Sequence, residues 1–197
     1  MHEKTAELII DDSERESDLL WASGFLAVDQ FTWLRDSRGS AIMLTDLELG
    51  RGEKESRVDE VISLSAVEKS AREVKGGEPC SFEEIVLQLL KSRNIERVEV
   101  PSRFPLMIAD FLRSGGIEVV ARENPFFSDR RIKRADEIRC LEESQAATEE
   151  AMALAIRLIS NSEPGPDGVL QLDGEPLTSE LIKYSVRSFL LSKGLQI

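Results

Sequence analysis

The stretch that decides the fold is residues 81–121, SFEEIVLQLLKSRNIERVEVPSRFPLMIADFLRSGGIEVVA. Ser81 lies three residues before Glu84, which is the spacing of a helix capping box. The apolar residues behind it recur at helical spacing, so they predict a helix with one buried face: Phe82, Ile85, Val86, Leu89 and Leu90. Residues 95–100 then alternate between apolar and charged side chains, which predicts a strand.

The second half of this stretch repeats the pattern. Pro105 can begin a helix, because its missing N–H is not needed in the first turn, and Gly115 with Gly116 can end that helix. Residues 117–121 predict a further strand. A strand, a helix and a strand within so few residues imply two parallel strands joined by a right-handed crossover.

The residues before this stretch predict an antiparallel hairpin. Two β-prone runs, Phe31–Leu34 and Ala41–Thr45, flank a polar segment in which Gly39 can adopt a turn conformation. Three neighbouring segments complete the domain as we expect it, namely a strand over 18–25, a helix over 48–57 and a strand over 58–64. The sequence therefore predicts an α/β domain with a mixed sheet.

The character of the sequence changes from Ser128 onward. Residues 129–160 are rich in Glu, Ala, Arg, Leu and Ile and contain no Gly or Pro, so we expect one long helix. Residues 161–168 are dense in turn formers and predict a break. A short strand at 169–170, a turn at 174–176 and a helix over 178–193 follow. This tail is too small to form a domain.

Composition excludes several classes of protein. Hydrophobic residues make up 41% and charged residues 31%, the balance of a soluble globular protein. The net charge of −12, from 37 acids and 25 bases, repels phosphates and anionic lipid headgroups, so we expect neither nucleic-acid nor membrane partners. No apolar run approaches the roughly 20 residues that span a bilayer, and residues 1–16 lack the features of a secretory signal. We expect a cytoplasmic protein whose two cysteines are free thiols.

Three strings resemble one known family. The first is residues 17–25, SDLLWASGF, taken with the run 42–56. It is similar to the creatinase/prolidase N-terminal domain. In that domain a "Tyr-Tyr-Leu-Thr-Gly-Phe"-like strand precedes a hairpin, whose second strand leads into an acidic helix. Residues 131–138, RIKRADEI, look like the "Arg-x-Ile-Lys-Ser-x-x-Glu-Ile" start of the helix that links this domain to the catalytic one. Residues 172–180 resemble the "Gly-x-Thr-Glu" entry into the next helix. The resemblance is to the creatinase/prolidase/aminopeptidase P family of pita-bread metallopeptidases.

This resemblance implies a domain plan. Residues 1–17 would be a disordered N-terminus, and residues 18–127 a creatinase/prolidase-like, ribonuclease H-like N-terminal domain. Residues 128–162 would form the linker helix, and residues 163–197 the truncated start of the catalytic domain.

The resemblance also implies a function for the family, but this sequence lacks the catalytic residues that the function requires. Members of the family hydrolyse Xaa-Pro bonds with two divalent metal ions, such as Mn, Co or Zn, held by two Asp, one His and two Glu. This sequence has a single histidine, His2, at an end where we expect a solvated side chain. We therefore assign no catalytic residue, no metal ligand and no cofactor to this chain. The complete parent protein would hold the two metal ions, form a homodimer and act on proline-containing peptides.

The aromatic residues beside the hairpin have two interpretations. Trp21, Phe25, Phe31 and Trp33 are most simply the core of the hairpin. In the family, however, the N-terminal domain of one subunit leans over the active site of the other and contributes to substrate binding. The segment 25–31 is the corresponding candidate, with Phe25, Asp29 and Phe31 as substrate-access residues. The alternative function is a standalone, non-enzymatic interaction module derived from the same family.

Overall fold

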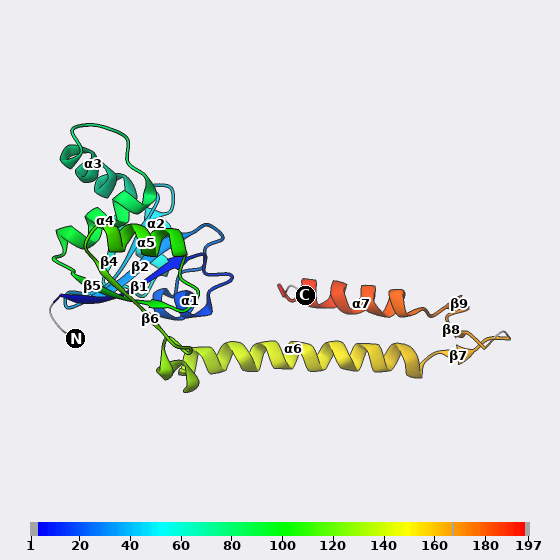
Figure 1. Ribbon diagram of the computed structural model, residues 1–197. Coiled ribbons are helices and arrows are strands. Elements are labelled where there is room, and N and C mark those ends of the chain that lie inside the picture. The colour runs from blue at the N-terminus through cyan, green and yellow to red at the C-terminus, as the bar shows by residue number, and fades with distance from the viewer. Residues whose placement is uncertain (1–3, 167, 196–197) are drawn as a thin grey trace. The chain divides into compact units, whose positions relative to one another are not determined.

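The computed structural model describes residues 4–166 and 168–195. The chain divides into two compact units, one ending at Arg130 and the other beginning at Arg131 (Figure 1). Among the described residues, no helix combines the length and the apolar character that crossing a bilayer requires.

The first unit is built on a mixed sheet of six strands in the order β4-β3-β2-β1-β5-β6. β2 pairs antiparallel with both β1 and β3, whereas the pairs β3 and β4, β1 and β5, and β5 and β6 are parallel. The predicted α/β fold with a hairpin and a parallel part is therefore confirmed. The strands are β1 (Thr5–Asp11), β2 (Phe31–Asp36), β3 (Gly39–Leu44), β4 (Glu60–Ser63), β5 (Arg97–Pro101) and β6 (Glu118–Arg122).

Helices cover both faces of this sheet. They are α1 (Ser17–Ser23), α2 (Leu49–Glu55), α3 (Leu64–Val74), α4 (Phe82–Ser92) and α5 (Leu106–Ser114). Because successive strand side chains point to opposite faces, Leu8 and Ile10 of β1 pack with residues of α4 and α5, whereas Ile9 packs with Leu19 of α1 and with Phe126. The unit therefore has one apolar core on each side of the sheet.

The prediction of a disordered N-terminus was wrong for the described residues. Thr5–Asp11 is β1, one of the two central strands of the sheet, and Ala6 to Ile10 are all buried. The Leu8-Ile9-Ile10 run is the continuous apolar pattern of a strand covered on both faces. The one buried acid among them, Glu7, accepts hydrogen bonds from Arg35 (2.6 Å) and Arg122 (2.8 Å), both distant in sequence.

Three further elements differ from the sequence prediction. Residues 17–23 form helix α1 instead of a strand; the Glu16 carboxylate accepts a hydrogen bond from the Asp18 N–H, and Gly24 ends the helix with a φ of 65°. Helix α3 was not predicted, although Ser63 caps it at the Ala66 N–H. The long helix begins later than predicted, at Ala135, after the short 3-10 helix η1 (Ser128–Arg131).

The second unit consists of two helices joined by a small sheet. α6 (Ala135–Ser160, 26 residues) is followed by the antiparallel strands β7 (Glu163–Pro164), β8 (Leu170–Leu172) and β9 (Glu175–Pro176) and by α7 (Ser179–Ser192). α7 returns alongside α6 (Figure 1), and the Lys193 ammonium lies 2.9 Å from the Glu150 carboxylate. Among the described residues of this unit, the buried apolar side chains are only Ala147, Ala151 and Leu177.

Candidate functional site

The segment 25–31, which connects α1 to β2, is fixed at its base. Ser13 is 1% exposed, its hydroxyl accepts a hydrogen bond from the Ala27 N–H (2.8 Å), and its own N–H donates to the Ala27 carbonyl (3.2 Å). Gly24 turns the chain into this segment with a positive φ, and a side chain there would meet Arg57. Hydrogen bonds between Ser13 and Ala27 therefore tie the connection to the residues that follow β1.

The three substrate-access candidates do not share one environment. Phe25 (0% exposed) and Phe31 (3% exposed) lie in the core, where their rings meet edge to face at a centroid distance of 5.7 Å. Asp29 lies on the surface. The structure thus places two of the three residues inside the domain and leaves Asp29 available to another molecule.

The exposed part of the segment includes two apolar side chains that the sequence analysis did not single out. Leu26 is 54% exposed and Val28 is 68% exposed. They alternate with the buried Phe25 and the half-buried Ala27, so an alternation of the kind found in strands was the signal that could have identified them. We call residues 26–29 the access tip.

Arg51 of α2 supports the access tip from the side. Its guanidinium lies over the Phe25 ring, 5.0 Å from the centroid, and donates to the Leu26 carbonyl (3.1 Å). A hydrogen bond to Glu55 raises the pKa of the Arg51 guanidinium above its ordinary value, with a smaller contribution from Glu48. Arg51 is thus a cation that links helix α2 to the access tip; the sequence analysis did not single it out.

The access tip is exposed and does not line a cavity large enough for a ligand. The hollow beside it, lined by the segment 25–31 and by residues of β3 and α2, has a volume of about 60 Å³. Ligand pockets have volumes of about 300 Å³ or more. This site can therefore act by presenting Leu26, Val28 and Asp29 to a second surface.

The described residues do not fit a metal centre. No three His, Cys, Asp or Glu side chains among them are grouped so that they could hold an ion. The acids Glu149 and Glu150 of α6 are engaged instead by Gln145 and Lys193. Cys80 and Cys140 are free thiols, and His2 lies outside the described residues.

Comparison with known proteins identifies the architecture. Prolidase from Pyrococcus furiosus superposes on 95% of this chain with a TM-score of 0.62 at 13% sequence identity, and the match covers 48% of that enzyme. The chain has the fold of the N-terminal portion of the prolidases. Xaa-Pro dipeptidase from Bacillus anthracis gives a TM-score of 0.69 at 12% identity, over 95% of this chain and 44% of that one.

The same fold recurs in an aminopeptidase. X-Pro aminopeptidase from Thermotoga maritima matches 93% of this chain and 47% of its own length, with a TM-score of 0.64 and 12% identity. No protein-family model matches the sequence, and no curated protein matches it significantly. This prolidase-like chain spans less than half the length of the three solved structures.

Proposed function

We propose that this chain forms the N-terminal, non-catalytic portion of a metal-dependent Xaa-Pro peptidase. The observation that carries the proposal is the structural likeness to a prolidase, an Xaa-Pro dipeptidase and an X-Pro aminopeptidase over more than nine-tenths of this chain and less than half of theirs. In this proposal residues 18–127 belong to the N-terminal domain, residues 128–162 to the linker helix and residues 163–197 to the start of the catalytic domain.

The contribution of the first unit to activity is substrate access. The access tip exposes a valine and an acid. Ser13 and Arg51 anchor the loop that carries them. An anchored loop with exposed side chains favours contact with a neighbouring subunit over a role that depends on loop movement. Asp29 and Val28 would contact the partner or the peptide directly. Phe25 and Phe31 would act from the core, by positioning the tip.

The metal ions belong to another part of the complete protein in this proposal. The described residues offer no set of ligands for a pair of divalent ions, so no step of hydrolysis is assigned to them. In the complete protein, which we expect to be a homodimer, two Mn, Co or Zn ions would activate water for attack on proline-containing peptides.

The reading frame beyond the codon for Ile197 provides the first test. We expect it to continue into a segment that supplies two Asp, one His and two Glu as metal ligands. The corresponding complete protein should be a dimer by light scattering and should hydrolyse Xaa-Pro dipeptides only with divalent metal. A complete protein without metal-dependent peptidase activity would instead support the standalone interaction module.

The access tip is tested in that complete protein. Asp29→Ala and Val28→Ser should lower kcat/KM for Xaa-Pro peptides about tenfold, with an unchanged melting temperature, because they remove contacts made only outside the domain. Val74→Ser is the matched control, since Val74 is 76% exposed on α3. Equal kcat/KM in all three variants would exclude the access role.

A further inference from the structure

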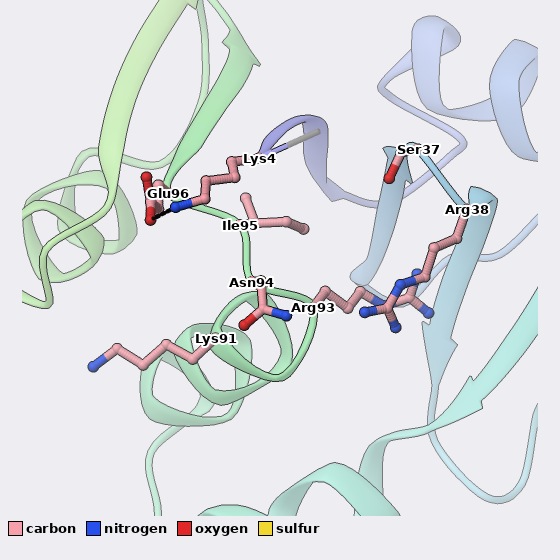
Figure 2. A pocket seen from close by; sticks show the side chains of 8 residues that line it. All are labelled: Lys4, Ser37, Arg38, Lys91, Arg93, Asn94, Ile95 and Glu96. Carbon is pink, nitrogen blue, oxygen red and sulfur yellow. Dashed lines mark hydrogen bonds and ion pairs between the residues drawn. The ribbon is translucent and has the colours of Figure 1, made fainter. Parts of the chain in front are cut away.

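A second hollow in the first unit is lined by none of the residues of the access tip. Its volume is about 550 Å³, which falls in the range of small-ligand pockets. Three chain segments line it: the start of β1, the β2–β3 turn and the end of α4 with the loop into β5 (Figure 2). The lining residues are Lys4, Ser37, Arg38, Lys91, Arg93, Asn94, Ile95 and Glu96.

The lining carries the opposite charge to the whole chain. Lys4, Arg38, Lys91 and Arg93 are basic, and Glu96 is the one acid among the lining residues. The chain as a whole has a net charge of −12. Basic side chains gathered against such a background make this hollow a favourable place for an anion.

Two of these cations are already compensated. The Lys4 ammonium is paired with Glu96 at 2.5 Å, as the dashed line in Figure 2 shows. The Arg93 guanidinium, whose side chain is 5% exposed, donates to Asp36 at 3.2 Å and also pairs with Glu60. The buried Arg93 charge requires such partners, whereas the pair of Lys4 and Glu96 lies on the surface; neither Lys4 nor Arg93 is left uncompensated.

The remaining two cations have no acid partner within the described part of the chain. Asp36 accepts a hydrogen bond from the Arg38 backbone N–H (2.7 Å), not from its guanidinium. Figure 2 shows the Arg38 side chain extending from the turn toward the Arg93 guanidinium, whereas the Lys91 side chain extends away from both arginines. Arg38 thus brings a charge that no acid compensates to the side of a second guanidinium, and an oxyanion would stabilise this arrangement.

The helix dipole explains only part of this arrangement. Lys91 lies in the last turn of α4, where a cation is favoured by the partial negative charge of the helix end. Arg38 belongs to the β2–β3 turn, outside any helix, so the dipole does not account for its position.

We propose that this hollow binds a small oxyanion of the phosphate class, with the Arg38 guanidinium donating to it. The Asn94 side-chain amide supplies a further donor, and Lys91 adds positive charge at the edge of the hollow. A guanidinium presents parallel donors that match a tetrahedral oxyanion better than a single carboxylate does, and the charge of Lys91 adds to the attraction for an anion. The hollow exceeds the size of inorganic phosphate and admits a small phosphate monoester. This assignment is independent of the proposed peptidase function.

Calorimetric titration of the 197-residue chain tests the proposal. Inorganic phosphate, glycerol 3-phosphate and acetate are the three probes. We expect saturable binding of both phosphates, weaker binding at high salt because counterions screen the charges, and at least tenfold weaker binding of acetate. Tighter binding of glycerol 3-phosphate than of inorganic phosphate identifies an ester as the natural occupant, and the reverse order identifies the free ion.

Variants localise the binding. Arg38→Gln should weaken phosphate binding about tenfold, and Lys91→Gln about threefold, each without a change in melting temperature because both side chains are exposed. Arg103→Gln removes the charge of another exposed arginine outside the hollow and should leave the affinity unchanged. The absence of saturable binding, or equal weakening by Arg103→Gln and Arg38→Gln, would overturn the proposal.

Discussion

At the scale of single residues, the segment 25–31 shows how one loop serves the core and the surface together. Its two phenylalanines are buried, whereas Leu26 and Val28 between them are more than half exposed. Composition alone does not distinguish these positions, because all four side chains are apolar. The difference in their exposure comes from the path of the backbone between α1 and β2, which turns the two phenylalanines into the core and Leu26 and Val28 toward solvent.

Truncation of a buried phenylalanine tests this assignment. Phe31→Ala should lower the free energy of unfolding by about 3–5 kcal/mol, because it removes a buried ring and leaves a cavity beside Phe25. Urea denaturation measures the change. Leu47→Ala is the control: Leu47 is 92% exposed, so the loss there should stay within about 0.5 kcal/mol. Similar losses for both variants would contradict the burial of Phe31.

A single carboxylate gives a prediction about pH. Hydrogen bonds from the Ser65 and Ser63 hydroxyls lower the pKa of Asp46 below its ordinary value of 3.8. A lowered folded-state pKa stabilises the protein above the pKa of the unfolded chain, and that stabilisation is lost as the pH falls through the folded-state value. Asp46→Asn should therefore destabilise the protein at pH 7 and have a diminishing effect below about pH 4.

Urea denaturation at pH 7 and at a pH below about 4 measures the loss of stability caused by Asp46→Asn. The control is Asp29→Asn, since no hydrogen bond to the Asp29 carboxylate occurs in the described part of the chain. We expect this control to change stability little at either pH. A destabilisation by Asp46→Asn that is as large at low pH as at neutral pH would be inconsistent with the hydrogen bonds from the two serines.

At the scale of helices and strands, the capping box at Ser81 and Glu84 correctly predicted the start of helix α4. The capping box of α4 forms in full: the Glu84 N–H donates to the Ser81 hydroxyl (3.3 Å), and the Ser81 N–H donates to the Glu84 carboxylate (2.7 Å). Residues 17–23 were different, because their apolar run is short enough to suit a strand or a helix. The N-cap at Glu16 and the C-cap at Gly24 stabilise these residues as helix α1.

The capping box can be tested by one substitution. Ser81→Ala should cost about 1 kcal/mol of unfolding free energy, because it leaves an N–H of the first turn of α4 without its side-chain partner. Thermal and urea unfolding measure the loss. Ser102→Ala, at an exposed loop position, should have no effect. If Ser81→Ala is also neutral, the cap contributes nothing to stability.

At the scale of the whole molecule, the two units differ in how much they bury. The first has an apolar core on each face of its sheet. In the second, α7 has no buried residue among those described, and several large apolar side chains of both helices are exposed: Ile138, Leu141, Met152, Ile156, Ile159, Tyr184 and Leu191. Burial of apolar surface is the main driving force of folding, so only the first unit has a sufficient core.

Separation of the units tests this difference. A fragment of residues 1–130 should unfold in one cooperative transition by circular dichroism, with a urea midpoint close to the main transition of the whole chain. A fragment of residues 131–197 should lose its helical signal gradually, since two helices without a shared core lack cooperativity. A cooperative transition in the second fragment, or its absence in the first, would contradict the division.

The sequence by itself determined the α/β class, the hairpin, helix α4, the parallel pair of strands joined by α5, and the long helix, because each depends on periodicity and capping over adjacent residues. Only the tertiary structure decided the role of the N-terminus. We expected disorder there, yet Glu7 is compensated by Arg35 and Arg122, and Leu8 to Ile10 are covered on both sides of the sheet. It also separated the buried Phe25 and Phe31 from the exposed Asp29 and gathered Lys4, Arg38 and Lys91 around one hollow. Such long-range contacts depend on how distant segments pack, and no pattern within a single segment contains that information.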